Sequence, residues 1–237
     1  MTIHFNQKNR HIAGFNLIEL MVAVSIGLVI TLGLSQVFVS MWGTSSDQTT
    51  LAQFQDNQRL TIAMVSAMVQ QAGYYPNPAT TTAAAALPTI NTTTDGAVLT
   101  AGTGISGTTG STSDTLDLAF TSSGSDNIFN CQGSTATTPT MYVNTFLVNA
   151  SNQLVCSVGD NTPMTLATNV ASMKIMYGVD SKGLGTTDSY MTAAQVQSAN
   201  MWAKVRMVAV TLNFNNPLYK TEPPVSWVQF INLMRAS

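Results

Sequence analysis

Charged side chains are scarce in this 237-residue chain, which has 9 Lys and Arg and 11 Asp and Glu, together 8% of the residues. Soluble globular proteins usually carry about 25% charged residues. The formal net charge is −2, so the chain lacks the excess of cationic side chains that drives counterion release on DNA or RNA. The composition gives no support to nucleic-acid binding and is typical of an exported, surface-exposed protein.

Histidine occurs only at His4 and His11, so nothing after residue 11 can supply an imidazole. This excludes Ser–His–Asp triads, His-based acid–base chemistry and His-ligated metals from the rest of the chain. We therefore expect a protein that is not an enzyme and has no cofactor and no metal site.

Cysteine is limited to Cys131 and Cys156, too few for a Cys-only zinc site. In an oxidising compartment, an even pair about 25 residues apart indicates a disulfide. Two free buried thiols are the alternative.

Proline is absent from Phe15 to Tyr75, and Pro76 and Pro78 follow. One helix can therefore occupy residues 15–75, with Gly73 as the residue that ends it. Residues 17–42 are almost wholly apolar and long enough to span a bilayer, which takes roughly 20 helical residues. The distal half has an apolar stripe at intervals of three or four, which predicts packing against a globular domain: Leu51, Phe54, Gln58, Ile62, Val65, Val69 and Ala72.

The charges around the apolar segment indicate its orientation. Lys8 and Arg10 precede it, and no further Lys or Arg occurs before Arg59. The positive-inside rule then places residues 1–14 in the cytoplasm and the rest of the chain across the membrane. Glu19 is the one charge inside the segment, and such a carboxylate indicates a functional group with a cationic partner.

The order Gly14, Phe15, Asn16, Leu-Ile, Glu19, Leu-Met, after a short basic leader, resembles the class III prepilin signature of the type IV pilin superfamily. The resemblance implies that prepilin peptidase cleaves between Gly14 and Phe15 and methylates the amino terminus of Phe15. It also implies a salt bridge between Glu19 and the Phe15 amine of a neighbouring subunit. Asn16 stands where Thr is usual. A secretory signal peptide fits poorly, since the small residue precedes a long apolar run; a plain single-pass anchor leaves Glu19 unexplained.

Beyond the helix the composition changes twice. Residues 76–113 are rich in Thr, Ala and Gly, which predicts a low-complexity connection of surface loops with one or two short strands. In residues 114–237 apolar and polar side chains alternate with a period of two, as in strands. Thr192 is a candidate N-cap for a helix over Ala193–Ala199. The predicted strands are Thr115–Phe120, Met141–Asn149, Gln153–Val158, Val170–Val179, Lys204–Phe214 and Val225–Leu233. We predict an α+β, pilin-like fold: a long N-terminal helix packed on a C-terminal antiparallel β-sheet.

Three later stretches resemble PilW-type minor pilins: residues 70–75 at the helix end, residues 176–180 with Trp202 and the strand after it, and residues 228–235. This implies a minor pilin that joins or primes type IV pilus assembly. Its partners would be other minor and major pilins, prepilin peptidase, the inner-membrane assembly platform and the lipid bilayer. It would sit in the inner membrane with its C-terminal domain in the periplasm, and at the cell surface after assembly.

Two other functions stay open. A type II secretion pseudopilin shares the N-terminal features, and a pilin-anchored adhesin or DNA-uptake module differs in the role of its globular domain. The loop at residues 180–188 is either a plain turn or a calcium loop; its Asp and Gly residues suit calcium, whereas Lys182 opposes a dication.

Overall fold

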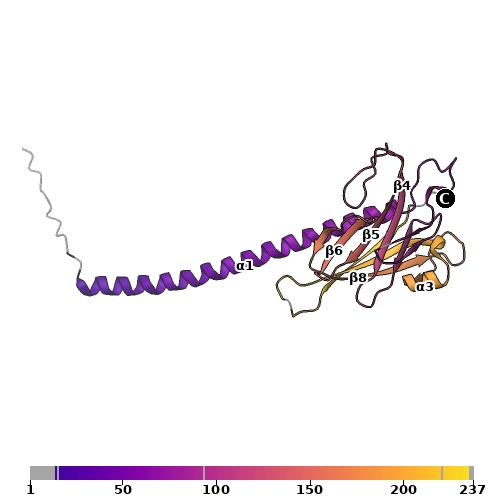
Figure 1. Ribbon diagram of the computed structural model, residues 1–237. Coiled ribbons are helices and arrows are strands. Elements are labelled where there is room, and N and C mark those ends of the chain that lie inside the picture. Colours follow the sequence, from indigo (N-terminus) through magenta and orange to yellow (C-terminus); the bar gives the residue numbers. More distant parts are fainter. Residues whose placement is uncertain (1–13, 15, 93, 220, 235–237) are drawn as a thin grey trace, which may run out of the picture. The chain divides into compact units, whose positions relative to one another are not determined.

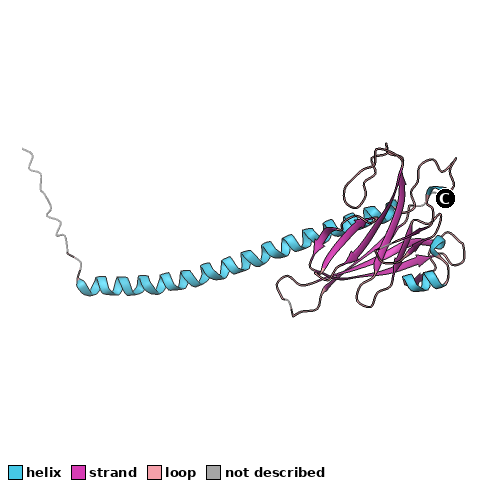
Figure 2. Cartoon of the chain, in the orientation of Figure 1, coloured by secondary structure: helices cyan, strands magenta, loops and turns pink. Residues whose placement is uncertain are grey.

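The computed structural model describes residues 14, 16–92, 94–219 and 221–234 (Figure 1). They form an α+β protein, with one long helix followed by antiparallel strands (Figure 2). The chain divides into two compact units, one ending at Thr50 and the other beginning at Leu51. Most of the predicted leader and the predicted first residue of the processed chain, Phe15, lie outside the described residues.

Helix α1 runs from Leu17 to Gln71. The Asn16 carbonyl accepts its first hydrogen bonds, from the amides of Glu19 at 3.0 Å and Leu20 at 3.2 Å. At the other end Gly73 takes a positive φ of 83°, the conformation that favours glycine. Its N–H donates to the Ala119 carbonyl at 2.8 Å, which joins the helix end to the following domain. The predicted helix and its terminating glycine are confirmed within the described residues.

The predicted apolar stripe on the distal half of α1 packs in the core of the second unit. Its later members, with Thr61 and Met68 beside them, are buried. Phe54 packs edge-to-face on Phe214, with ring centroids 5.9 Å apart. Leu51, the first predicted member, is 38% exposed, so the buried stripe begins about one turn later than the sequence pattern indicates.

The strands form two larger antiparallel sheets where the sequence predicted one. The first has the order β3-β4-β5-β6-β7 and the second β11-β10-β8-β9. The first contains Ile105–Thr108 (β3), Thr115–Ser122 (β4), Thr140–Val148 (β5), Gln153–Val158 (β6) and Met164–Thr168 (β7). The second contains Val170–Val179 (β8), Ser189–Met191 (β9), Val205–Phe214 (β10) and Val225–Asn232 (β11). The break falls at Asn169, whose φ of 60° turns the chain between β7 and β8. The sequence indicates strands but not which sheet each joins.

One core unites the two sheets with the distal half of α1. Leu118 and Phe146 come from the first sheet, Met173 and Val210 from the second, and Val65 and Val69 from the helix. The short helix α3 (Ala193–Ser198) has the predicted Thr192 cap, completed as a capping box by Gln195. A 3-10 turn at Trp202–Lys204 follows it.

Residues 83–92 and 94–99, here called the cover segment, contain more secondary structure than their composition predicts. They contain helix α2 (Ala83–Ala86) and the paired strands β1 (Ile90–Asn91) and β2 (Val98–Leu99). Leu87 and Leu99 are fully buried against Ala119 of β4. A β-carbon at the following Gly104 would collide with the backbone of Gly73, so glycine is required where the chain leaves this segment. The cover segment therefore packs on the outer face of the first sheet.

Candidate functional site

The candidate assembly segment is the first half of α1 with the residues before it. Glu19 lies in the first helical turn, where a carboxylate is favoured by the N-terminal end of the helix dipole. Its side chain has no ion-pair partner within the described part of the chain, where both ion pairs belong to the second unit. Gly14 is described and exposed, whereas Phe15 is outside the described residues. The predicted pairing of Glu19 with Phe15 of another subunit thus stays a prediction.

The apolar side chains of this segment are uncovered in the single chain. Leu17, Leu28 and Trp42 are each more than half exposed, as are most large apolar residues between them. It is the one described helix with the length and composition to cross a membrane.

Three hydroxyl groups in the segment donate within the helix. Ser25 donates to the Val22 carbonyl at 2.9 Å, and Thr31 donates to Gly27 at 2.7 Å. Ser35 donates to the Thr31 carbonyl at 2.8 Å. Because a bilayer offers no hydrogen-bonding partner, these internal bonds lower the polar cost of moving the three hydroxyl groups into lipid or an apolar bundle.

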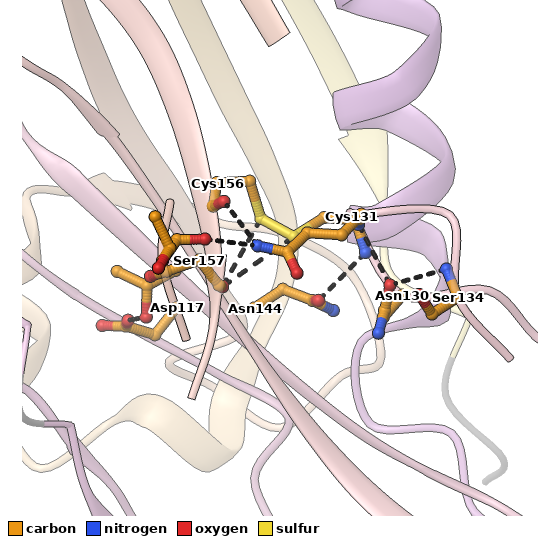
Figure 3. The surroundings of a disulfide bond; sticks show 10 residues. Asp117, Asn130, Cys131, Ser134, Asn144, Cys156 and Ser157 are labelled. Carbon is orange, nitrogen blue, oxygen red and sulfur yellow. Dashed lines mark hydrogen bonds between the residues drawn. A yellow bond between two sulfur atoms is a disulfide. The ribbon is translucent and has the colours of Figure 1, made fainter. Parts of the chain in front are cut away.

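The predicted disulfide is present in the second unit, where Cys131 and Cys156 are bonded with Cα atoms 6.3 Å apart. Cys156 lies on β6, and Cys131 lies in the long β4–β5 connection; both are buried. Asn144 on β5 accepts the Cys131 N–H through its side-chain oxygen at 3.1 Å (Figure 3). The bond therefore fastens a long loop to β6, an interior strand of the first sheet.

The loop around Cys131 is also held by its own polar groups. The Asn130 side-chain oxygen accepts N–H bonds from Gln132 and Ser134, both at 3.0 Å (Figure 3). The side-chain amide of Gln132 donates to the Thr162 carbonyl at 2.9 Å. Such local bonds shape the loop but do not replace the covalent link.

Replacing both cysteines, Cys131→Ser with Cys156→Ser, is expected to lower the free energy of unfolding by about 3–4 kcal/mol, the loop-entropy value for this separation. Thermal unfolding of the wild type and the double variant under non-reducing conditions measures it. Reducing agent should lower the melting temperature of the wild type and leave that of the double variant unchanged. Equal wild-type melting temperatures with and without reductant would contradict the prediction.

The loop at residues 180–188 uses its carboxylates to form the turn itself. Asp180 accepts the N–H groups of Leu184 and Gly185, both at 2.8 Å, and Arg206 lies 3.7 Å away. Burial would raise the pKa of Asp180, but these amide hydrogen bonds, with the Arg206 charge, outweigh it and lower the pKa. Asp188 accepts from the Ser181 hydroxyl at 2.8 Å. The carboxylates already have donors, an arrangement typical of a structural turn.

Sequence reasoning missed a pair of facing carboxyl groups under the cover segment. Asp117 on β4 is fully buried, and its Oδ1 accepts the Thr145 hydroxyl at 2.6 Å. Asp95, in the β1–β2 turn, accepts the hydroxyls of Thr92 and Thr115 and makes a side-chain hydrogen bond with Asp117. Neither the strand pattern around Asp117 nor the Thr-rich stretch around Asp95 signals this meeting.

The two acids have opposite pKa shifts. Burial raises the pKa of Asp117 to about 8, and the Asp95 charge adds to the effect. Burial also raises the pKa of Asp95, but hydrogen bonds from Thr115, Thr92 and the Ala97 amide outweigh the effect of burial, so the pKa is lowered. The pair therefore favours one ionised and one neutral carboxyl group.

The family model of type IV pilus-assembly protein W matches residues 128–226, less than half of the 237-residue chain. The match includes the disulfide and strands β5 to β10. It supports the resemblance to PilW-type pilins seen at residues 176–180 and Trp202, whereas residues 70–75 and 228–235 lie outside the match. No curated protein matches the chain significantly.

Among solved structures, a type IV-like pilin from Thermus thermophilus is similar, with 11% sequence identity and a TM-score of 0.42. The similarity covers 76% of this chain and 95% of that one.

Proposed function

We propose that this chain, a pilin-related protein with a PilW-type C-terminal region, is a minor pilin that joins or primes a type IV pilus. The observation that carries the proposal is the uncovered apolar half of α1, opening on Glu19 and continuous with the helix that enters the β-rich domain. Lipid would cover these side chains before assembly, and neighbouring pilin helices would cover them afterwards. The function is association rather than catalysis.

In the proposed sequence of events, prepilin peptidase cuts after Gly14 and methylates Phe15. The β-rich domain stands in the periplasm, where the Cys131–Cys156 bond can form and persist. The new Phe15 amine is cationic, and it neutralises Glu19 of an adjacent subunit as the helices pack. Other pilins and the assembly platform in the inner membrane are the partners.

Mass spectrometry of sheared surface filaments from the native host tests processing and incorporation together. We expect a chain that begins with N-methylated Phe15 and lacks residues 1–14. A host without prepilin peptidase should keep the full-length chain in its membrane. A chain that retains Met1 in wild-type cells and is absent from filaments would refute the proposal.

A deletion strain separates the pilus from a type II pseudopilus. The proposal predicts fewer surface filaments with normal protein secretion. If the deletion strain loses protein secretion but keeps normal filaments, the chain belongs to the pseudopilus. If it keeps normal filaments but loses adhesion or DNA uptake, the chain has a binding role.

A further inference from the structure

We propose that a proton shared by the carboxyl groups of Asp95 and Asp117 holds the turn between β1 and β2 on the first sheet, and that loss of this proton as the pH rises releases the cover segment. The release is local, so the two sheets and the distal half of α1 stay folded. The device lies within the second unit and does not involve the assembly segment.

The two acids can be hydrogen-bonded to each other only through a proton. Asp117 is fully buried, and the Thr145 hydroxyl donates to its Oδ1 at 2.6 Å. Its Oδ2 receives no hydrogen from a donor group among the described residues, while the side chain is hydrogen-bonded to Asp95. Ionised carboxylates only accept hydrogen bonds, so a bond between two carboxyl groups requires that one of them is protonated. One proton therefore serves both groups.

The surrounding groups place this proton on Asp117. Asp95 accepts the hydroxyls of Thr92 and Thr115. It also accepts the Ala97 N–H at 3.1 Å, and donors of this kind favour the ionised form of a carboxyl group. Asp117 has one hydroxyl donor among the described residues and is removed from water, which favours the neutral acid. The link is thus a neutral acid that donates to a carboxylate, and such charge-assisted bonds are strong.

This bond attaches the turn of the cover segment to the sheet. Asp117 belongs to β4, whereas Asp95 lies in the turn at residues 92 and 94–97. Within the described part of the chain, the hydrogen bonds from this turn to the sheet all use the Asp95 side chain, which contacts Thr115 and Asp117. The apolar attachment of the segment rests mainly on Leu87 and Leu99. Segments with so few attachments open locally before the whole domain unfolds.

Loss of the shared proton replaces the bond with repulsion. Two ionised carboxyl groups would then face each other under the cover segment, and Asp117 would be a buried charge without a counter-charge. Both described ion pairs use other acids. Thr92 and Thr94 of the turn line a cavity of about 380 Å³, so this side of the turn has room to move. Lifting the turn lets water solvate both carboxylates.

Other ionisable groups lie near the pair. Asp114, just before β4, is ion-paired with Lys174 at 3.1 Å. Tyr177 on β8 is buried and donates to the Ser106 carbonyl at 3.4 Å. Burial, and then the surrounding carboxylates, raise the pKa of Tyr177 well above 10, so it stays neutral in the experiment below. Asp160 lines the same cavity as the turn and provides a control.

Hydrogen exchange of the full-length protein in detergent micelles, measured by mass spectrometry from pH 5 to 7, tests the proposal. The closed segment holds a proton that the open segment has released, so the open fraction rises with pH. After correction for intrinsic exchange rates, protection of the amides at residues 94–99 should fall about tenfold per pH unit, the slope for one proton. Amides of β10 should stay more protected at each pH, because they exchange only when the domain unfolds.

Two isosteric variants supply the bridging hydrogen without a titrating proton. Asp117→Asn can donate an amide hydrogen to Asp95, and Asp95→Asn can donate one to Asp117. In each variant, protection of residues 94–99 should be independent of pH between 5 and 7. Asp160→Asn removes the acid on the cavity wall and should keep the wild-type slope.

The proposal is overturned if protection of residues 94–99 in the wild type does not change with pH, or if both asparagine variants of the pair keep the wild-type slope. It is also overturned if residues 94–99 exchange at the same rate as β10, because the segment would then open only when the whole domain unfolds. Loss of the slope in Asp160→Asn would assign the titration to the cavity wall instead of the pair.

Discussion

Glu19→Ala is expected to leave removal of residues 1–14 intact and to abolish entry of the chain into filaments. The cleavage site lies at Gly14 and Phe15, which the substitution does not touch. In a packed bundle, however, the variant would leave the Phe15 amine of a neighbouring subunit buried without its counter-charge. Loss of one partner of a buried ion pair typically costs about 3–5 kcal/mol, and each 1.4 kcal/mol is a factor of about ten in an equilibrium. Incorporation should fall at least 100-fold.

Immunoblots of sheared filaments and membranes, with the mass of the processed chain, measure both effects. Asp47→Asn is the matched control, since Asp47 is an exposed acid on the same helix beyond the apolar segment. That variant should enter filaments normally. Normal incorporation of Glu19→Ala would show that the carboxylate is dispensable and would remove the proposed pairing.

The features that the sequence predicted well are those with a local pattern. A proline-free run with an apolar half and a three-four stripe predicts α1, because each residue of a helix is positioned by its near neighbours. Strand β8 occupies Val170–Val179, the range predicted from its alternation. The Thr192 cap was predictable for the same reason, since capping involves residues three positions apart.

The burial of Asp117 could not be predicted, because it depends on a distant segment. The sequence TLDLAF alternates, which places Leu116 and Leu118 on one face of the strand and Asp117 on the other. Both leucines are fully buried in the core. The cover segment then buries the other face, although its Thr- and Ala-rich composition has no periodic signal. The acid pair is a product of tertiary structure.

The short elements were missed for a related reason. Strand β9 has three residues and β7 has five, too few for alternation to rise above the background of a Thr-rich chain. Their positions are set by longer neighbours, β8 and β6, which supply a ready edge for pairing. Such an edge is formed by the assembled sheet, so it cannot be recognised from the sequence of the short strand that pairs with it.

The domain should lose stability as the pH rises from about 4 to 8. The folded-state pKa of Asp117 is raised to about 8 from an ordinary value of 3.8, by burial and then by the Asp95 charge. The folded protein therefore holds a proton that the unfolded chain has released throughout this window. The associated stability is complete below pH 4 and is lost as the pH passes through 8.

Other groups near the pair do not reverse this sign. The pKa of Asp95 is lowered, so its contribution is lost only on acidification below about pH 4. Asp114 is ion-paired with Lys174 at 3.1 Å. Tyr177 is buried, and its pKa is raised well above 10 by that burial and by the surrounding carboxylates, so it stays neutral across the window.

Chemical denaturation at several pH values measures the effect. Each pKa unit is worth about 1.4 kcal/mol, so the wild type should lose on the order of 5 kcal/mol between pH 4 and 8. Asp117→Asn cannot ionise and should show a nearly flat profile above pH 4, exceeding the wild type in stability at pH 8. Asp56→Asn, an acid on α1 outside the buried stripe, should retain the wild-type slope. A flat wild-type profile would contradict the prediction, because a buried Asp117 that ionises without cost must already have a partner in the folded protein.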